Sequence, residues 1–190
     1  MASIPEESRE KAKKLLYNLA SDKMKIALCV KGTFDLKTWP KEYFAQVVKE
    51  LKQKYDADFF VVGAPSDREY ADEVIAICHE HILNLCGKTS LLDLAALFYI
   101  CDLLVTVDTG ATHIAATTGV KMVTMYGCTS PKRWHPYNKN ARVLSYEPAC
   151  CPCKIGPEDC PSWPQPECLW KVTPEMVLQE CYNLLDKADH

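Results

Sequence analysis

The chain reads Asp108-Thr109-Gly110-Ala111-Thr112-His113 at the point where an apolar run gives way to small and polar residues. The preceding run, residues 103–107, is typical of a buried strand, and residues 114–118 predict a short helix that ends at Gly119. In open α/β sheets, ligands bind where strands end and helices begin, because unpaired N–H groups and the positive end of the helix dipole meet there. This stretch therefore predicts an α/β fold and a site for an anion, typically a phosphate.

Strand and helix patterns alternate on both sides of this stretch. Further strands are predicted at residues 26–30, 59–62, 82–85, 122–126 and, briefly, 143–144. Further helices are predicted at 5–20, from Pro40 to Leu51, at 69–78, at 91–99 and from Thr173 onward. Alternation with short connections implies a doubly wound, mainly parallel sheet with helices on both faces. The irregular part is residues 127–172, which are rich in Pro, Cys and Trp.

Composition limits the classes of function. A formal net charge of -3 provides no basic field for nucleic acid. No apolar run reaches the length needed to span a bilayer, and the first residues lack a signal-peptide pattern. Several of the 11 cysteines are dispersed through apolar segments, which is typical of a reducing compartment. We therefore expect a cytoplasmic protein that does not bind nucleic acid.

Glycine with polar neighbours ends four of the predicted strands. These ends are Lys31-Gly32-Thr33, Gly63, Asp108-Thr109-Gly110 and Gly127-Cys128-Thr129. Glycine permits close backbone approach, and it also commonly punctuates strand ends without any ligand. Because the carboxyl ends of parallel strands share one edge of the sheet, we expect the four to line a crevice.

Within the crevice, each polar side chain has a structural alternative. Asp108 could bind a sugar hydroxyl or cap the helix, and capping is the commoner role for Asp. Thr109 and Thr112 could each donate a hydroxyl to a phosphate oxygen or act as a cap. His113 lies on the expected first turn, where its imidazole could face the anion. Lys37 could neutralise a diphosphate or remain in solvent.

Five cysteines cluster between Cys150 and Cys168. Cys150, Cys153, Cys160 and Cys168 could hold a structural zinc, with Cys151 as an alternative donor. The second pair lacks the usual Cys-x-x-Cys spacing, so disulfides or packed reduced thiols are the alternatives. In each case the cluster would hold a long loop in place. Redox chemistry at Cys150 and Cys153 is disfavoured, because no thioredoxin-like context precedes them.

Taken together, these segments resemble the C-terminal half of glycosyltransferase family 9, the ADP-heptose:lipopolysaccharide heptosyltransferases. The stretches that carry the resemblance are the strand ending at Gly32, Lys37-Thr38-Trp39-Pro40 with Phe44, Val61-Val62-Gly63 with Glu69, residues 84–91, residues 108–116, residues 126–131, and the cysteine-rich region from Cys150 to Cys168 ahead of Thr173-Pro174-Glu175. The Asp-[Ser/Thr]-Gly-x-x-His-Ile-Ala element is specific, and the others are looser but occur in the family's order.

The resemblance implies the C-terminal, Rossmann-like domain of a GT-B fold. Residues 1–22 would form a linker helix and 23–190 the donor-binding domain, with a Cys-rich loop at 147–172 and a closing helix at 173–188. By position, Asp108, Thr109, Gly110, Ala111, Thr112 and His113 would hold the diphosphate and sugar of an ADP-sugar. Lys37 would contact phosphate and Glu69 would lie near the ribose or base. Transfer would be inverting and would need no metal, because helix dipole, amides and lysine offset the charge of the leaving group.

The resemblance also implies partners. The acceptor would be a lipopolysaccharide core or related glycan, and the full-length enzyme would be cytoplasmic or peripheral at the inner membrane. Nothing in the chain resembles the N-terminal acceptor domain, which supplies the general base in the family. We therefore expect the chain alone to be inactive, and we assign none of its residues as catalytic. The family commonly has Ser-Gly-Pro-Met where this chain has Thr109-Gly110-Ala111-Thr112.

Two other functions remain open from the sequence. One is a non-catalytic nucleotide-binding or metal-stapled module. The other is a nucleotide-sugar 2-epimerase relative, which is disfavoured because such enzymes place adjacent acids where this chain has Ala115 and Ala116.

Overall fold

The computed structural model describes residues 4–20, 22–153 and 156–186. They form a six-stranded sheet in the order β3-β2-β1-β4-β5-β6, with each neighbouring pair parallel. The strands are β1 (Lys25–Cys29), β2 (Asp58–Val61), β3 (Ile82–Asn84), β4 (Leu103–Val107), β5 (Lys121–Tyr126) and β6 (Ala141–Ser145). The expected doubly wound α/β fold with a parallel sheet is confirmed.

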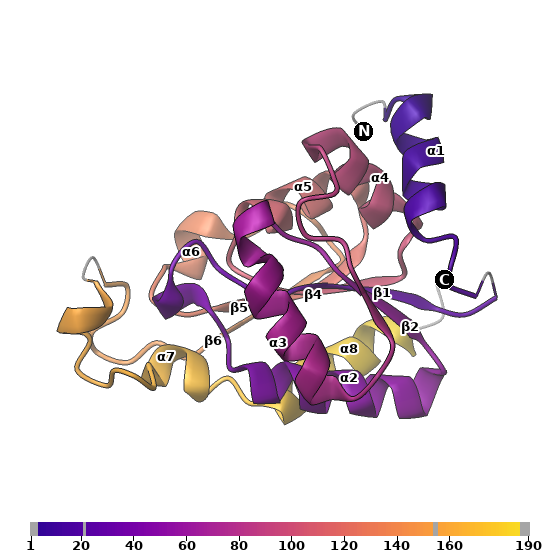
Figure 1. The fold of residues 1–190 in the computed structure, drawn as a ribbon. Helices are drawn as coiled ribbons and strands as arrows, with labels where there is room; N and C mark the ends of the chain where they lie inside the picture. Colours follow the sequence, from indigo (N-terminus) through magenta and orange to yellow (C-terminus); the bar gives the residue numbers. More distant parts are fainter. Residues whose placement is uncertain (1–3, 21, 154–155, 187–190) are drawn as a thin grey trace.

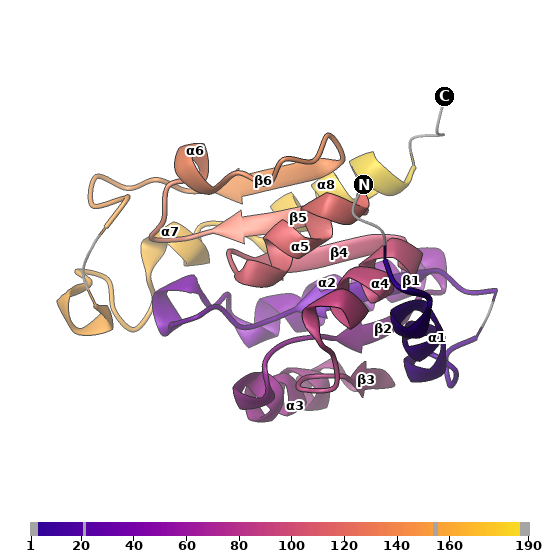
Figure 2. The same ribbon diagram turned by 90° about the horizontal axis from the view of Figure 1, so that it is seen from above.

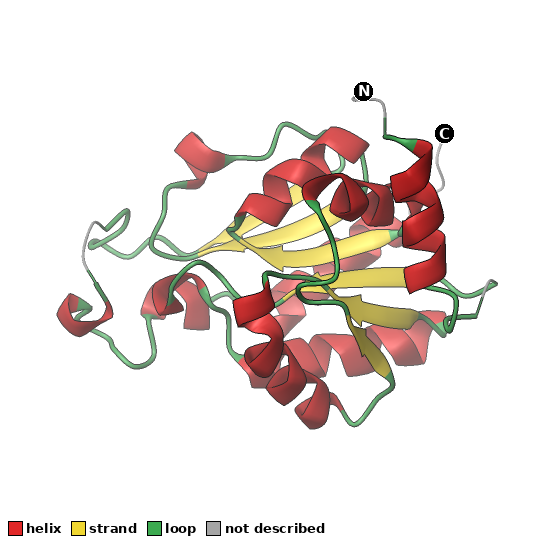
Figure 3. Cartoon of the chain, turned by 45° about the horizontal axis from the view of Figure 1, so that its top comes forward, coloured by secondary structure: helices red, strands yellow, loops and turns green. Residues whose placement is uncertain are grey.

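Helices cover both faces of this sheet (Figures 1 and 3). One face carries α2 (Lys41–Tyr55), α3 (Arg68–Cys78) and α8 (Pro174–Leu185), and the other carries α1 (Glu6–Leu15), α4 (Leu91–Ile100) and α5 (Gly110–Thr118). Shorter elements are α6 (Pro131–Trp134), α7 (Glu167–Trp170) and the 3₁₀ turns η1 (Asp35–Lys37), η2 (Pro65–Asp67) and η3 (Pro157–Asp159). Among the described residues, none of the helices has the length and apolar character needed to cross a membrane.

The two cores follow from the alternation of side chains along the strands. In β1, Ile26 and Leu28 belong to the core beneath α2, α3 and α8, whereas Ala27 and Cys29 belong to the core beneath α1, α4 and α5. Because both faces are covered, the central strands are apolar on both sides, and all five residues of β4 are buried. This is why the strands could be recognised as continuous apolar runs.

Three boundaries differ from expectation. The helix after β4 begins at Gly110, four residues before the predicted Ile114, because Thr109 caps it. The first helix ends at Leu15 instead of residue 20, although Leu16 and Leu19 beyond it remain buried. The stretch 127–172 is not one irregular loop, since it contains α6, β6, η3 and α7.

Two of the segments expected from the sequence extend beyond the residues that the structure describes. The predicted linker segment 1–22 includes residues 1–3 and 21, and the predicted closing helix 173–188 includes residues 187–188, all of which lie outside the described residues. Within them, α8 begins at Pro174, where the Thr173 hydroxyl accepts a hydrogen bond from the Met176 N–H.

Candidate functional site

A cleft lies along the carboxyl ends of four strands. It has a volume of about 490 Å³ and is lined by the turns that follow β1, β2, β3 and β4, including Gly32, Gly63, Gly87 and Gly110. β1 and β4 are neighbours, yet the chain leaves them toward opposite edges of the sheet, to β2 and to β5. Such a reversal of strand order opens a ligand crevice in doubly wound folds. Three of the four predicted glycine-bearing strand ends line the cleft.

The N-terminus of α5 opens into this cleft. Thr109 is the cap, and its hydroxyl accepts a hydrogen bond from the Ala111 N–H at 3.1 Å. Thr109, Gly110 and Ala111 all line the cleft, and a Cβ built on Gly110 would meet no atom within 4 Å. Backbone approach at Gly110 is therefore unobstructed. The Ala111 and Thr112 amides are bonded to Thr109, whereas no bond to the Gly110 amide is formed by the described residues. That amide and the positive end of the helix dipole make this a candidate anion site.

Asp108 does not cap α5, although capping is the commoner role of Asp at such a turn and was the role expected for it. Its carboxylate lies 2.7 Å from the Lys37 ammonium, and the Thr129 hydroxyl donates to the same oxygen. The Asp108 side chain is 6% exposed and that of Lys37 is 15% exposed. Asp108 therefore holds Lys37 at the rim between β4 and β5, and Thr129, from the fourth predicted glycine-bearing strand end, is a further partner of Asp108.

Two glycines make this arrangement possible. A Cβ on Gly32 would lie 2.4 Å from the Lys37 Cβ, and a Cβ on Gly127 would lie 2.7 Å from the Leu36 carbonyl oxygen. Both distances are far below normal van der Waals contact, so only glycine lets η1 fold back against the strand ends. The glycines at these strand ends thus position Lys37.

Thr112 is not available to a ligand. It is fully buried, and its hydroxyl donates to the Val107 carbonyl at 3.0 Å, with the Thr106 hydroxyl 3.4 Å away. The expectation that Thr112 contacts phosphate is therefore wrong. Its hydroxyl fastens the first turn of α5 to the end of β4.

His113 is exposed, and its ring lies beside that of Trp134, with centroids 6.3 Å apart. No hydrogen bond to its ring is formed by the residues described here, so both ring nitrogens are available. Glu69 is exposed on the first turn of α3. It lines a shallow hollow that shares Pro65 and Ser66 with the cleft, which places it just outside the cleft.

The cysteines are arranged differently from the expected zinc set. The Cys153 thiol contacts that of Cys128, and the Cys151 thiol contacts that of Cys168, while Cys150 is exposed. All are free thiols. Within the described part of the chain, no three His, Cys, Asp or Glu side chains form a group that could hold a metal ion. In this arrangement Cys150, Cys153, Cys160 and Cys168 are reduced thiols, and a structural zinc at this loop stays a prediction.

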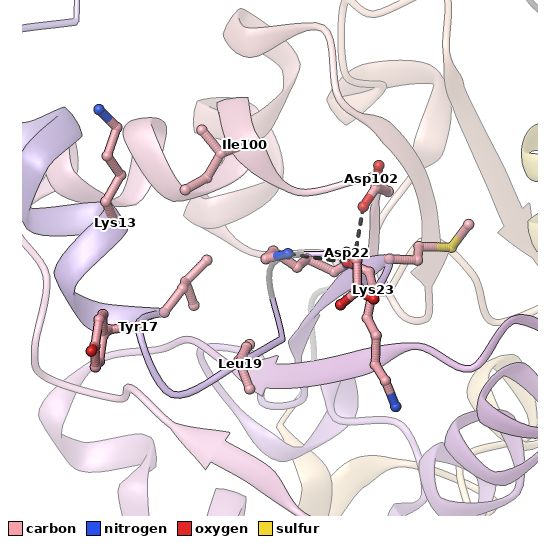
Figure 4. Close-up of a pocket in the computed structure, with 10 residues that line it drawn as sticks. Lys13, Tyr17, Leu19, Asp22, Lys23, Ile100 and Asp102 are labelled. Atoms are coloured by element: carbon pink, nitrogen blue, oxygen red, sulfur yellow. Dashed lines mark hydrogen bonds between the residues drawn. The ribbon is translucent and has the colours of Figure 1, made fainter.

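A second hollow, of about 910 Å³, lies at the amino ends of β1 and β4 (Figure 4). The C-terminal ends of α1 and α4 wall it, and their negative dipole ends disfavour an anion. Two of its polar groups are already paired, because Asp102 accepts from the Lys25 N–H at 2.7 Å and the Lys25 ammonium donates to the Ala20 and Lys23 carbonyls. The smaller cleft at the carboxyl ends is the better ligand site.

Comparison with known proteins identifies relatives. The family described as "Glycosyltransferase family 9 (heptosyltransferase)" matches residues 2–163. A curated relative, lipooligosaccharide heptosyltransferase 2 of Campylobacter jejuni, is 33% identical over 156 residues, covering 80% of this chain and 48% of the relative.

Two solved structures share the fold. The ADP-heptose lipopolysaccharide heptosyltransferase II of E. coli superposes with a TM-score of 0.78 at 25% identity, covering 96% of this chain and 52% of that one. A family 9 glycosyl transferase from Veillonella parvula gives a TM-score of 0.84 at 26% identity, covering 98% and 53%. The chain thus spans about half the length of the relatives it matches.

Proposed function

This chain belongs to glycosyltransferase family 9, and we propose that it is the half of a heptosyltransferase that binds the nucleotide-sugar donor. The donor is an ADP-heptose and the acceptor a lipopolysaccharide-type glycan. The observation that carries this proposal is the open N-terminus of α5 at the strand-order reversal, where Gly110 faces empty space beside the cleft. The name of the E. coli relative, an ADP-heptose transferase, supports the choice of nucleotide.

In this proposal, the adenosine lies in the cleft and the diphosphate at the first turn of α5. Charge accumulates on the diphosphate as the glycosidic bond breaks. The Gly110 amide, the helix dipole and the Lys37 ammonium stabilise that charge, because they are fixed before the reaction and partly shielded from water. Asp108 keeps Lys37 in place. Glu69, at the edge of the cleft, is assigned to the ribose or base.

The general base that activates the acceptor hydroxyl is not assigned to any residue of this chain. From the resemblance, we expect that base in the other half of such enzymes. We therefore expect these 190 residues to bind ADP and ADP-heptose but to transfer sugar only when that half is supplied. Binding without transfer even in its presence would favour the alternative of a non-catalytic nucleotide-binding module.

Calorimetric titration with ADP, UDP and GDP tests the proposal. We expect ADP to bind most tightly, and His113→Ala to weaken ADP-heptose binding about tenfold by removing a polar contact of roughly 1.4 kcal/mol. His135→Ala is the matched control, because His135 is also exposed but its ring is already bonded to the Pro136 carbonyl. Equal affinity for all three nucleotides, or no effect of His113→Ala, would contradict the assignment.

A further inference from the structure

The short helix α6 is fastened to the same rim as the N-terminus of α5. It follows β5, and the Tyr126 hydroxyl at the end of β5 donates to the Trp134 carbonyl. Thr129, just ahead of α6, donates to the Asp108 carboxylate. Figure 2 shows α6 on the β5–β6 side of the molecule, whereas the cleft is lined from β1 to β4 and includes no residue of α6. The cleft itself therefore uses no residue of α6, and α6 meets the proposed donor site only where the His113 ring lies beside that of Trp134.

Arg133 of α6 is held without an acidic partner. Its guanidinium carbon lies 5.2 Å from the centroid of the Trp134 ring. Trp134 is 44% exposed, and its ring also lies beside the exposed imidazole of His113. A guanidinium stacked on an indole keeps the N–H groups at its edge available, and it loses little freedom on binding a planar or tetrahedral oxyanion.

The segment that contains α6 carries only basic residues, of which Lys132 and Arg133 lie on α6 itself while Lys139 and Arg142 lie at the amino end of β6, at the opposite edge of the sheet. Residues 129–146 contain Lys132, Arg133, Lys139 and Arg142 but neither Asp nor Glu, in a chain whose net charge is -3. Arg142 pairs with Glu180. Within the described residues, no carboxylate lies within ion-pair distance of Lys132 or Arg133. This local excess of positive charge is complementary to an anion that the chain itself does not supply.

We propose that Arg133, stacked on Trp134 beside His113, binds a phosphate or carboxylate group carried by the acceptor sugar. This inference rests on the proposed function, which places the donor diphosphate at Gly110. α6 then lies beyond the diphosphate, on the β5 side and outside the cleft, and the proposal places the acceptor sugar there. The Trp134 ring provides an apolar surface for the sugar, and Arg133 selects glycans with an anionic substituent.

Tryptophan indole resonances of the ¹⁵N-labelled chain test this proposal. The chain has four tryptophans, of which Trp39 is fully buried and Trp163 is 43% exposed, so Trp163 serves as an internal control. Trp134→Phe assigns the signal. We expect mannose 6-phosphate to shift the Trp134 indole resonance saturably, mannose to leave it unchanged, and inorganic phosphate to bind more weakly. Arg133→Gln is expected to weaken mannose 6-phosphate binding at least fivefold, while the matched loss of charge in Lys139→Gln leaves it unchanged.

Four results would overturn the proposal. They are no shift at any mannose 6-phosphate concentration, equal shifts with mannose, equal weakening by Lys139→Gln, and displacement of mannose 6-phosphate by ADP together with weaker ADP binding in Arg133→Gln. The last would assign Arg133 to the donor diphosphate. ADP binding is followed separately in the same ¹⁵N-labelled protein, from the backbone amide resonance of Gly110. Failure of the donor site and failure of the α6 site are therefore distinguishable.

Discussion

At the scale of single residues, the Lys37–Asp108 pair sets the electrostatics of the rim. Both side chains are largely withdrawn from water, and each is the other's ionic partner. Taking charges out of water is costly, and removing one partner of a buried pair leaves the other uncompensated. The positions are far apart in sequence, so no local pattern could pair them. Asp108 was expected to cap a helix because that is what Asp commonly does at a strand-to-helix turn.

This pair can be measured by a double-mutant cycle. Lys37→Met is expected to destabilise the fold by about 3 kcal/mol, because Asp108 would stay buried with only the Thr129 hydroxyl as its partner. Adding Asp108→Asn should recover at least half of that loss. Urea unfolding of the four proteins gives the coupling energy. Additive effects of the two substitutions would show that the pair is not coupled.

Residue by residue, the sequence identified Thr109 and Gly110 correctly as members of the cleft, since a capping hydroxyl and a glycine are local signals. It failed at Thr112, where the same residue type is turned inward to the Val107 carbonyl. The direction of a side chain on the first helical turn depends on where the helix starts. That start was misplaced by four residues, because Gly110 is a poor helix former that a good cap nevertheless makes tolerable.

At the scale of elements, the N-terminus of α4 has a reciprocal side-chain cap. Ser90 accepts from the Asp93 N–H and Asp93 accepts from the Ser90 N–H, which is a capping box. The Lys11 ammonium of α1 lies 2.6 Å from the same carboxylate. Burial opposes ionisation of Asp93, but the hydrogen bonds from Lys11 and Ser90 outweigh it and hold the pKa of Asp93 well below its usual range. Asp93 thus links α1 to α4.

This depressed pKa predicts a pH dependence. A carboxyl whose pKa is lower in the folded state contributes stability above its unfolded pKa, near 4, and loses it as the pH falls toward the folded pKa. Asp93→Asn is therefore expected to lower the free energy of unfolding by about 1 kcal/mol at pH 7, a difference that shrinks below pH 4. Denaturant unfolding from pH 7 to pH 2.5 measures it. Glu10→Gln is the control, since Glu10 pairs with Lys13 on the exposed side of α1, and a pH-independent Asp93→Asn difference would contradict the account.

The strands were the most predictable elements, because buried parallel strands appear as short apolar runs between turn residues. β6 was seen only as Val143-Leu144 because most of it is half-buried at the edge of the sheet. The cysteine-rich segment was least predictable. Spacing suggested Cys150 and Cys153 as a pair, whereas the fold brings Cys153 to Cys128 and Cys151 to Cys168. Which thiols become neighbours depends on contacts between segments far apart in the sequence, and the spacing of cysteines does not show these contacts.

At the scale of the whole molecule, the sheet separates two hydrophobic cores, and the candidate ligand-binding residues lie along its carboxyl edge. Most thiols lie within the cores, where burial raises the pKa of Cys29 and Cys78 to about 11 and that of Cys86 and Cys128 to about 12. A thiol attacks only as its thiolate. The buried cysteines of the folded protein therefore behave as small apolar side chains.

Thiol labelling at pH 7.5 tests this view of the cores. Cys150, which is exposed, is expected to react first, while the buried Cys29, Cys86, Cys101 and Cys181 react only when the chain unfolds in denaturant. Mass spectrometry of peptides labelled with iodoacetamide identifies the order. Early labelling of Cys29 or Cys86 in the native protein would mean that the cleft side of the sheet opens, contrary to a closed, packed core.

The central claim is that a nucleotide diphosphate binds at the N-terminus of α5, and glycine amide resonances test it most directly. The chain has seven glycines, so selective ¹⁵N-glycine labelling gives a readable spectrum, and Gly110→Ala assigns the key signal without a steric clash. ADP is expected to shift Gly110 most, with smaller shifts at Gly32, Gly63 and Gly87, which line the same cleft, and none at Gly119 at the other end of α5. An unchanged Gly110 resonance at saturating ADP would contradict the account.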